Sequence, residues 1–502
     1  MLRTSSYTIY VDIPEDAGEM LLVHGYTGAY DKVSRTVGDY LRSQERGPAH
    51  KPLHGEWKSD PAAERPVSTY APSDRTVELL KQRGYMTVMD FEEEEGFFAR
   101  TAKKRHQRAL QQGTSYIFMP TYNCNLRCPY CFQDHMRTDP QYARLLNVIT
   151  PEMVDRIFAA MPTLEAEHGW EEGVEFTRNI GFYGGEPFLA VNRPIIEYII
   201  KGARDMGPVR FWAVSNATEL EAYEDLLGPE GIASVQITLD GPPEEHNKRR
   251  IHADGSGSFD QIARNIDLCL DRGAIVSVRM NLDKTNILHV PRLAEEIVAR
   301  GWDRRRGFSV YTARVVHGNA NAKFQTGFAT TWELDETIDD LRIAFPDMRV
   351  IGRPDDGLQA RARRLFEDRA HGLPHLKSSF CGAHTGMYIF DQFGDIYACW
   401  ERTGDEKVRI GRVLDDGGVE MNAGLTKMWR SRTPASNPTC RKCRYALHCG
   451  GGCAVLAEGQ NGKFYSNYCD GYGDRFRHSV AQAYLDHVAG AAIVEDTRVC
   501  DL

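Results

Sequence analysis

Twelve cysteines fall into two main groups along this chain of 502 residues, and no other feature restricts its fold as strongly. Three of them, Cys124, Cys128 and Cys131, are close together in sequence, and seven more lie between Cys381 and Cys469. Because thiols stay reduced in the cytosol, grouped cysteines in a cytosolic chain indicate metal binding or catalysis rather than disulfide bonds. The fold must therefore gather each group where its thiols reach a shared metal centre.

The composition is that of a globular protein with several domains. Apolar residues make up 42% of the chain, charged residues 26%, and the formal net charge is -9, so the sequence predicts no basic surface for nucleic acid or an anionic membrane. The start, Met1 to Ser6, lacks the apolar core of a signal peptide. No apolar run approaches the roughly 20 residues that span a bilayer. We therefore expect a cytoplasmic protein with no nucleic-acid and no membrane partner.

The middle of the chain, from about residue 114 to 330, alternates strand and helix patterns as parallel α/β domains do. Six strands are predicted, at 116–119, 179–183, 209–214, 234–239, 275–281 and 308–313. Helices are expected after Thr150, a capping residue followed by proline, and from Ser258 to Arg272, before Gly273. Six such units predict an α/β fold, an incomplete (β/α)6 barrel, whose active site is built by the loops after the strands.

The first 110 residues have a different pattern. Tyr7–Val11 and Met20–Val23 are predicted to pair as a hairpin, and helices are expected at Asp31–Leu41 and Asp74–Gly84. This section is therefore expected to be an α+β domain of its own.

The first cysteine group directly follows the first barrel strand and has the pattern Cys124-x3-Cys128-x2-Cys131, with Tyr130 before the last cysteine. This pattern resembles the cluster-binding loop of radical S-adenosylmethionine (SAM) enzymes, whose fold is a partial β/α barrel. The resemblance implies a 4Fe–4S cluster with one iron open to SAM, and reductive cleavage of SAM to a 5'-deoxyadenosyl radical. The alternative is a zinc site, although three ligands leave a structural zinc without its fourth.

Gly184-Gly185-Glu186-Pro187 follows the second strand and is similar to the Gly-Gly-Glu-Pro motif of the same family, in which the backbone binds the methionyl ammonium. Polar residues also end the next three strands. The residues that the resemblance implies for SAM binding are Tyr130, Gly184, Gly185, Glu186, Ser215, Asn216, Thr238, Asp240 and Arg279. Taken alone, a Gly-Gly pair after a strand is more often just a turn, and each polar residue at the ends of the next three strands is equally well explained as a turn residue or a structural cap.

The second cysteine group matches the seven-cysteine spacing of the SPASM domain, the C-terminal extension of peptide-modifying radical SAM enzymes. The resemblance implies two auxiliary 4Fe–4S clusters. One is assigned to Cys440, Cys443, Cys449 and Cys469, and the other to Cys381, Cys399 and Cys453. The second cluster is one ligand short, so either a residue such as His384 or Asp395 completes it, or its iron is open. Cys269 lies in a predicted helix and is expected to be a buried apolar residue.

The sulfatase-maturating branch of the family has an aspartate base immediately after the second cysteine of this domain. Here Trp400 occupies that position and Glu401 follows it. Adjacent residues on a strand point to opposite faces, so this departure puts the formylglycine chemistry of that branch in doubt. Glu401 is the candidate catalytic acid or base.

The N-terminal section resembles, more weakly, the winged-helix domain that binds the leader of a ribosomally made peptide. A structural appendage is the alternative. The predicted order of domains is a leader-recognition-like domain at 1–110, the radical SAM barrel at 111–330, a bridging region at 331–377, the SPASM domain at 378–475, and a C-terminal helix and tail at 476–502.

Together these patterns predict a three-cluster peptide maturase that forms a thioether or carbon–carbon crosslink. Reduced flavodoxin or ferredoxin is the expected electron donor. The alternatives are a two-electron oxidation of a Ser or Cys side chain, as in formylglycine formation, and, outside enzymes, a zinc-binding scaffold protein.

Overall fold

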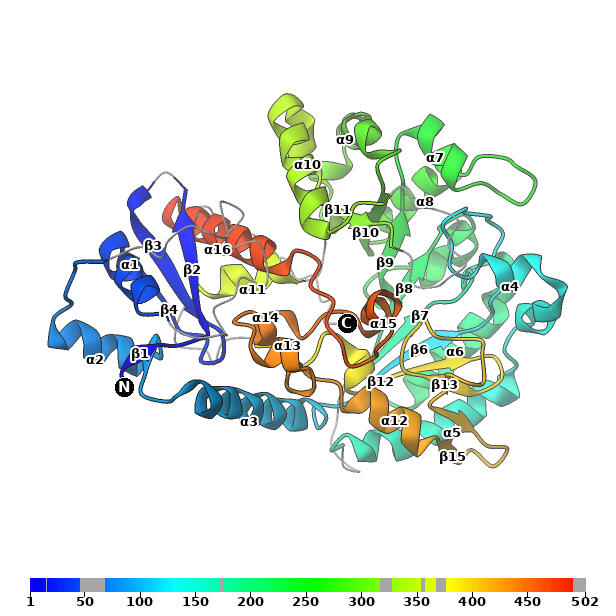
Figure 1. Cartoon of the computed structure of the whole chain (residues 1–502). Helices are drawn as coiled ribbons and strands as arrows, with labels where there is room; N and C mark the ends of the chain where they lie inside the picture. The colour runs from blue at the N-terminus through cyan, green and yellow to red at the C-terminus, as the bar shows by residue number, and fades with distance from the viewer. Residues whose placement is uncertain are drawn as a thin grey trace. The chain divides into compact units, whose positions relative to one another are not determined.

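The computed structural model describes residues 1–14, 16–45, 68–170, 176–316, 327–353, 357–366 and 376–490. The chain divides into two compact units (Figure 1). One unit contains Met1–Ala109, Asp356–Cys381 and Ser431–Leu502, and the other contains Leu110–Asp355 and Gly382–Arg430. Over the described ranges, none of the helices has the length and apolar character needed to cross a membrane.

The second unit, which we call the barrel unit, is built on a mostly parallel sheet. Its first six strands are β6 (Ser115–Met119), β7 (Arg178–Phe182), β8 (Val209–Ser215), β9 (Ile232–Thr238), β10 (Ile275–Leu282) and β11 (Phe308–Arg314). They are hydrogen-bonded in chain order, and every neighbouring pair is parallel. All six strands predicted from the sequence are therefore confirmed, and the sheet is an α/β partial barrel.

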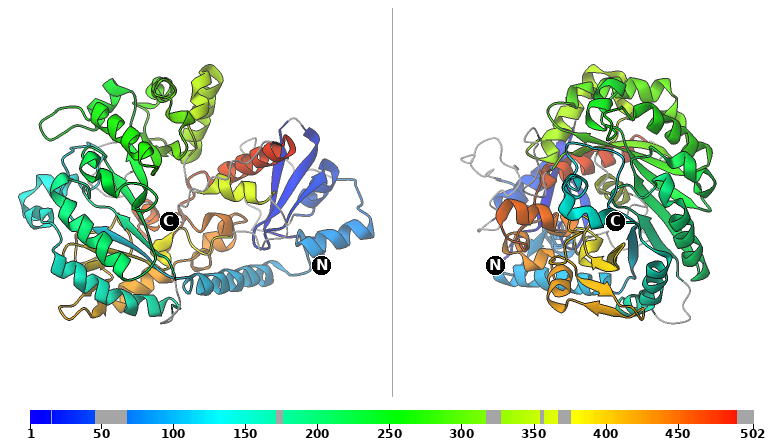
Figure 2. Two further views of the ribbon diagram at one scale, coloured as in Figure 1. Left: turned by 180° about the vertical axis from the view of Figure 1, so that it is seen from behind. Right: turned by 90° about the vertical axis from the view of Figure 1, so that its right-hand side faces the viewer.

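Helices cover the outer face of this curved sheet (Figure 2). The main ones are α5 (Pro151–Glu167), α6 (Arg193–Asp205), α7 (Pro243–Arg249), α8 (Phe259–Asp271) and α9 (Val290–Ala299). The Thr150 hydroxyl accepts a hydrogen bond from Met153 N–H and so caps α5, as predicted. Helix α8 ends before Gly273, whose φ of 78° lies in the left-handed region. Cys269 of α8 is fully buried, which confirms its expected role as an apolar core residue.

The sheet does not stop at β6. Strand β12 (Met387–Asp391) pairs in parallel with β6, so a segment from far along the chain becomes its second neighbour. Three antiparallel strands, β13 (Asp395–Tyr397), β14 (Gly411–Val413) and β15 (Val419–Met421), then complete a sheet of ten strands. Cys399 follows β13, so it is carried on the same sheet as the barrel.

The first unit, which we call the N/C unit, contains a three-stranded antiparallel sheet of β2 (Thr8–Ile13), β3 (Asp16–His24) and β4 (Tyr30–Ser34). The predicted hairpin is confirmed, but the helix predicted over Asp31–Leu41 is wrong in its first turn. Residues up to Ser34 pair with β3, and α1 begins only at Arg35 and ends at Ser43. Ser34 ends the strand because its side chain caps α1 by accepting from Val37 N–H.

The remaining helices of the N-terminal section are α2 (Asp74–Arg83) and α3 (Phe91–Ala109). They are joined in the N/C unit by α16 (Tyr472–Val488), which lies beside β2 and β3 (Figure 1). One hydrophobic core is common to β2, β3, α3 and α16 and includes Tyr7, Val11, Phe98, Cys440, Cys443, Leu447, Phe476 and Val480. The N-terminal sheet and the cysteine-rich segment therefore stabilise each other by sharing buried apolar surface.

Candidate active site

The first cysteine group lies on the loop that leaves the C-terminal end of β6. Cys124 and Cys128 are buried and Cys131 is half-buried. Three groups are within hydrogen-bonding reach of their sulfurs: Leu126 N–H is 3.4 Å and Asn216 Nδ2 3.6 Å from Cys124, and Arg137 Nη2 is 3.2 Å from Cys131. Burial raises the pKa of Cys128 to about 12, so a thiolate at this position requires a positive partner, which a metal centre provides.

The Gly-Gly-Glu-Pro segment is bound directly to this loop. Gly185 N–H donates to Thr121 O at 3.1 Å, and Glu186 N–H donates to Asn123 O at 2.7 Å. A Cβ on Gly185 would lie 2.2 Å from Asn123 O, and one on Gly184 would lie 2.5 Å from Thr121 O. Only glycine allows this close approach, which holds the end of β7 against the cysteine loop.

The Glu186 side chain ties β7 to β8. Its carboxylate accepts hydrogen bonds from Ser215 Oγ at 2.8 Å and from Asn216 N–H at 2.6 Å, and burial raises its pKa to about 7. Ala217 comes next and has a φ of 62°, a region that alanine seldom adopts. In the described part of the chain only one other non-glycine residue, Asp470 beside Cys469, has a positive φ. Backbone strain is thus found next to residues of both predicted sites.

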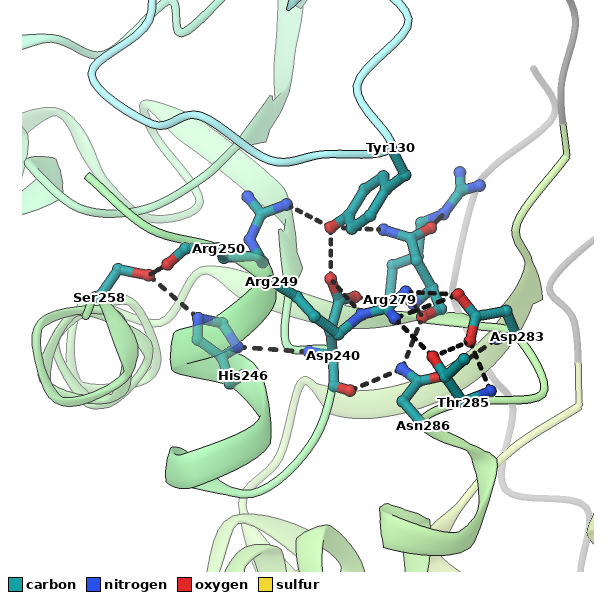
Figure 3. A network of polar contacts seen from close by, with 11 residues as sticks. Tyr130, Asp240, His246, Arg249, Arg250, Ser258, Arg279, Asp283, Thr285 and Asn286 are labelled. Carbon is teal, nitrogen blue, oxygen red and sulfur yellow. Dashed lines mark hydrogen bonds and ion pairs between the residues drawn. The ribbon is translucent and has the colours of Figure 1, made fainter. Parts of the chain in front are cut away.

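Tyr130 and the ends of β9 and β10 form a second polar network (Figure 3). The Tyr130 hydroxyl donates to the fully buried carboxylate of Asp240, and it accepts from Arg250 Nη1 at 2.9 Å and from Asn281 Nδ2 at 3.4 Å. Arg279 Nε donates in turn to Asn281 Oδ1 at 2.9 Å. The predicted residues Tyr130, Asp240 and Arg279 are therefore brought together.

Further hydrogen bonds and an ion pair hold Asp240 and its neighbours in place (Figure 3). Asp240 N–H donates to His246 Nδ1, which requires that nitrogen to be an unprotonated acceptor, and burial lowers the pKa of His246. Asn286 Nδ2 donates to Asp240 O at 2.8 Å. Arg249 makes an ion pair with the buried Asp283 at 3.1 Å. These contacts leave Asp240 little freedom to move, as preorganised sites require.

Glu401 and Trp400, which follow Cys399, lie near Tyr183 at the end of β7. The Trp400 ring stacks on that of Tyr183 with centroids 5.4 Å apart. Burial is the largest cause that raises the pKa of Tyr183, and the nearby charge of Glu401 is the next. Cys131 and Cys399 raise this pKa further, whereas Arg279 lowers it. Burial raises the pKa of Glu401 as well. Glu401 therefore combines a raised pKa with a place beside Tyr183, on which cysteines of both motifs also act, and such a carboxyl group is suited to acid–base chemistry.

The four cysteines predicted to share an auxiliary cluster are gathered in the N/C unit. Burial raises the pKa of Cys443, and its neighbours Cys440, Cys469 and Cys449 raise it further. The pKa of Cys469 is raised to about 11 by burial, while Asn467 Nδ2, 3.1 Å from its sulfur, opposes this. Thiolates this close together would repel one another, so these four cysteines can act as thiolates only beside a compensating cation.

The three other SPASM-type cysteines are divided between the units. Cys381 and Cys453 belong to the N/C unit, and Cys399 belongs to the barrel unit. Burial lowers the pKa of Arg432, and the nearby Cys381 and Cys453 oppose this effect. Arg432 is clamped by four backbone carbonyls, those of Gly451, Gly452, Phe464 and Ser466. The two candidate additional ligands are engaged within the barrel unit: His384 Nδ1 is 2.9 Å from Trp429 O, and Asp395 pairs with Arg409 at 2.7 Å.

Over the described residues, no three His, Cys, Asp or Glu side chains are arranged to hold a single metal ion. The fit of the cysteines to a metal centre therefore rests on their burial and on the donors near their sulfurs. Sequence reasoning missed Arg137, Arg250 and Arg432, because each acts through contacts with distant or irregular segments. The only signal available in the sequence was their position within ten residues of a predicted site residue, which is common to many arginines.

Comparison with known proteins agrees with this geometry. Residues 118–297 match the model of the Radical SAM superfamily. An uncharacterised protein of Archaeoglobus fulgidus is 25% identical over 78% of this chain and 89% of its own length. A cysteine-type anaerobic sulfatase-maturating enzyme of Clostridium novyi is 23% identical over 73% of this chain and 94% of its own length.

Solved structures resemble this fold as well. Native anSMEcpe with bound AdoMet has a TM-score of 0.56 and 16% identity, and the match covers 75% of this chain and 99% of that one. At this level of identity the likeness concerns the fold alone. The superfamily uses SAM with a 4Fe–4S cluster, and the family match sets aside a non-catalytic zinc scaffold. The partial barrel, the cysteine loop after its first strand and the family match agree: residues 118–297 are a Radical SAM domain, and the chain is an enzyme.

Proposed function

We propose that the protein is a three-cluster maturase that modifies a ribosomally made peptide, most favourably by a thioether or carbon–carbon crosslink. One observation carries the proposal. The N-terminal sheet shares its hydrophobic core with the segment that holds Cys440, Cys443, Cys449 and Cys469. A peptide bound to that sheet is therefore held on the same compact unit as a cluster site, which raises its effective concentration there.

The edge strand β4 is suited to bind an extended leader. In the described residues its one strand neighbour is β3. His24 N–H donates to Ala29 O, so these two residues form a hydrogen-bonded pair. In an antiparallel ladder such pairs recur at every second residue, which makes Asp31 and Val33 the β4 residues that bond to β3. The N–H and C=O groups of Lys32 then face away from the sheet, where an added strand would meet them.

When bound, a reduced 4Fe–4S cluster supplies the electron that cleaves SAM into methionine and a 5'-deoxyadenosyl radical. The residues of this chain orient the reactants. Gly184 and Gly185 offer backbone groups to the methionyl part of SAM, Arg279 is assigned to its carboxylate, and Tyr130 and Asp240 keep the loop in place. Glu401 is assigned to move a proton on the substrate, since burial favours its protonated form.

The cluster assigned to Cys381, Cys399 and Cys453 has one iron without a cysteine ligand from this chain. We assign that position to a substrate thiol, because thiolate is the ligand such clusters prefer. Binding there would orient the peptide and favour a thioether product. The sulfatase-maturating relative favours oxidation to formylglycine as the second candidate, although Trp400 stands where that branch has its aspartate.

A direct experiment is to incubate the anaerobically reconstituted enzyme with SAM, a reductant and the short peptides encoded beside its gene. A crosslink removes two hydrogens from one peptide and gives no reaction with a hydrazide probe, whereas formylglycine reacts with that probe. Formation of 5'-deoxyadenosine without any change in the peptides would contradict the assigned substrate class.

The leader site is tested separately with Lys32→Pro, which removes an outward N–H from β4, and with the control Lys32→Ala. Proline is tolerated at sheet edges, so folding and iron content are expected to persist. We expect Lys32→Pro to raise the KM for the full peptide and to leave the KM for a leaderless peptide unchanged. Equal KM values for Lys32→Pro and Lys32→Ala would rule out β4 as the leader site.

A further inference from the structure

Arg137 lies beside the first cysteine group, on a short helix that follows it. Helix α4 (Asp134–Thr138) begins three residues after Cys131 and turns the Arg137 side chain back to the loop. Its Nη2 donates to Cys131 Sγ at 3.2 Å, and only 2% of the side chain is exposed. Asp134, 3.5 Å away, is its nearest carboxylate and is 39% exposed.

Two further nitrogens of this guanidinium, Nε and Nη1, are buried without a hydrogen-bond partner in the described part of the chain. Other buried arginines of the protein are satisfied differently. Arg178 makes a bidentate pair with the buried Glu165, and Arg3 pairs with the fully buried Glu94. Burying a cation is costly, and besides the ion pair with Asp134 the groups beside Arg137 that can carry compensating negative charge are the cysteine sulfurs.

The sulfurs of the cysteine loop provide that charge. Cys131 Sγ lies 3.2 Å from Nη2 and is the sulfur that the guanidinium contacts. The unpartnered Nε and Nη1 groups remain for further sulfur acceptors. A charge-assisted hydrogen bond in a buried place is stronger than one in water, and its strength grows with the negative charge of the acceptor.

We propose that Arg137 is a tuning residue that favours the reduced state of the SAM-cleaving cluster. The inference rests on the assignment of that cluster to Cys124, Cys128 and Cys131. Reduction by a one-electron donor of low potential adds one negative charge to the cluster and its thiolates, with no bond formed or broken in the protein. A fixed cation at Cys131 stabilises the product of that step more than the reactant, so the midpoint potential is raised.

The test is a redox titration of the holoenzyme, monitored by electron paramagnetic resonance, with Arg137→Gln and Arg137→Lys. The SAM-cleaving cluster is identified by the change that SAM causes in its signal. We expect Arg137→Gln to lower the ratio of reduced to oxidised cluster about tenfold at a fixed potential, which corresponds to about 59 mV for one electron. Arg137→Lys keeps the charge and is expected to recover most of this loss.

Arg127 provides a matched control in the same loop. Its Nη1 donates to the carbonyls of Cys124 and Leu126 rather than to a sulfur. Because the Arg127 side chain is half-buried and more screened by water, we expect Arg127→Gln to change the ratio of reduced to oxidised cluster by less than about twofold. An Arg127→Gln shift equal to that of Arg137→Gln would show a general charge effect and overturn the specific role of Arg137.

Two more outcomes would overturn the proposal. One is an unchanged potential in Arg137→Gln with full iron content. The other is an equal shift in the glutamine and lysine variants, since a merely structural role would not be rescued by charge. If Arg137→Gln does not retain its cluster, the equally neutral Arg137→Met replaces it, with the same lowered ratio of reduced to oxidised cluster expected and an unchanged potential contradicting the proposal. No peptide is needed, so the result is independent of the assigned substrate.

Discussion

Tyr130 and Asp240 are 110 positions apart in sequence, and the hydroxyl of the first donates a hydrogen bond to the carboxylate of the second. This contact fixes the cysteine loop to the ends of β9 and β10, where Arg250 and Asn281 complete the partners of the hydroxyl. Tyr130 was predicted to contact SAM directly. Its hydroxyl instead has protein partners, so we expect the residue to act on SAM through the position of the loop and through its ring.

Tyr130→Phe removes one hydroxyl and leaves the buried Asp240 carboxylate without that donor. We expect the free energy of unfolding to fall by about 1–3 kcal/mol, the usual cost of an unsatisfied buried group. The KM for SAM should rise because the loop is less well fixed. Thermal unfolding and the initial rate of 5'-deoxyadenosine formation measure the two effects. Tyr142→Phe, on the half-buried tyrosine of the neighbouring helix η2 (Pro140–Leu146), is the control and should change neither.

Replacing Cys124, Cys128 and Cys131 together by alanine tests the assignment of the SAM-cleaving cluster. We expect complete loss of 5'-deoxyadenosine formation, with about eight of twelve irons retained because the auxiliary sites use other thiols. Iron and sulfide analysis measures how much iron the variant retains. SAM cleavage that survived in this variant would place the reactive cluster elsewhere, and loss of all iron would mean that the sites do not assemble independently.

Gly185→Ala places a Cβ 2.2 Å from Asn123 O and 2.3 Å from Tyr122 O, so β7 must move away from the cysteine loop. A clash with backbone cannot be relieved by a rotamer change, and we expect a loss of about 2 kcal/mol or more in the free energy of unfolding. SAM affinity should also fall. Gly424→Ala, at an exposed position of α12 (Ala423–Arg430), is the matched control and should leave both unchanged. Normal SAM affinity in Gly185→Ala would argue against a SAM contact in this segment.

Glu186 and Asp391 make stability depend on pH near neutrality. Burial raises the pKa of each to about 7, and the neighbouring Asp395 adds to the effect at Asp391. Between about pH 4.5 and 7 the folded protein retains these protons while the unfolded chain releases them, so stability falls as pH rises through this range and is then constant. Each group contributes on the order of 3 kcal/mol.

When the pH is raised from 5.5 to 7.5, the Tm of Glu186→Gln should therefore fall less than the Tm of the unchanged protein. The double variant with Asp391→Asn should lose the least. Glu295→Gln, at an exposed position on α9, is expected to behave like the unchanged protein. A pH dependence identical in Glu186→Gln and the unchanged protein would contradict the raised pKa of Glu186.

Glu401→Gln keeps the size of the side chain and removes its ability to exchange a proton. We expect peptide modification to fall at least about tenfold, within the range typical of a lost general acid or base, while SAM cleavage continues. The measurement is the ratio of modified peptide to 5'-deoxyadenosine. Glu406→Gln, in the same loop but 61% exposed, should keep the ratio unchanged. A parallel fall of both products in Glu401→Gln would indicate a role in SAM binding instead.

The sequence predicted much of the barrel because local patterns determine it. Each of its six strands is a short apolar run bounded by turn residues, and Thr150 and Gly273 mark helix ends through their own conformational preferences. The strand β4 was missed because Asp31, Val33 and their neighbours also fit a helical spacing, and only pairing with β3 decides between the two. Tertiary contact overrode local preference there.

The candidate site was predicted as a set of residues but not as a network. Ser215 and Asn216 were identified by their place after β8, yet nothing local indicates that both bond to Glu186. Arg137 lies outside every motif, and its importance follows only from the direction of its side chain. Contacts between residues far apart in sequence are fixed by packing, which no single segment encodes.

The pairing of β12 with β6 has a consequence for how the protein is made. During synthesis β6 leaves the ribosome long before Met387–Asp391 exist, and until then one side of the first barrel strand has no permanent neighbour. The N-terminal sheet likewise waits for α16 and the cysteine-rich segment to cover its core. Neither unit is complete before the last hundred residues emerge, so nascent chains expose a sheet edge and apolar surface. A premature stop codon between the barrel and Met387 would therefore leave both units incomplete rather than remove only the C-terminal part.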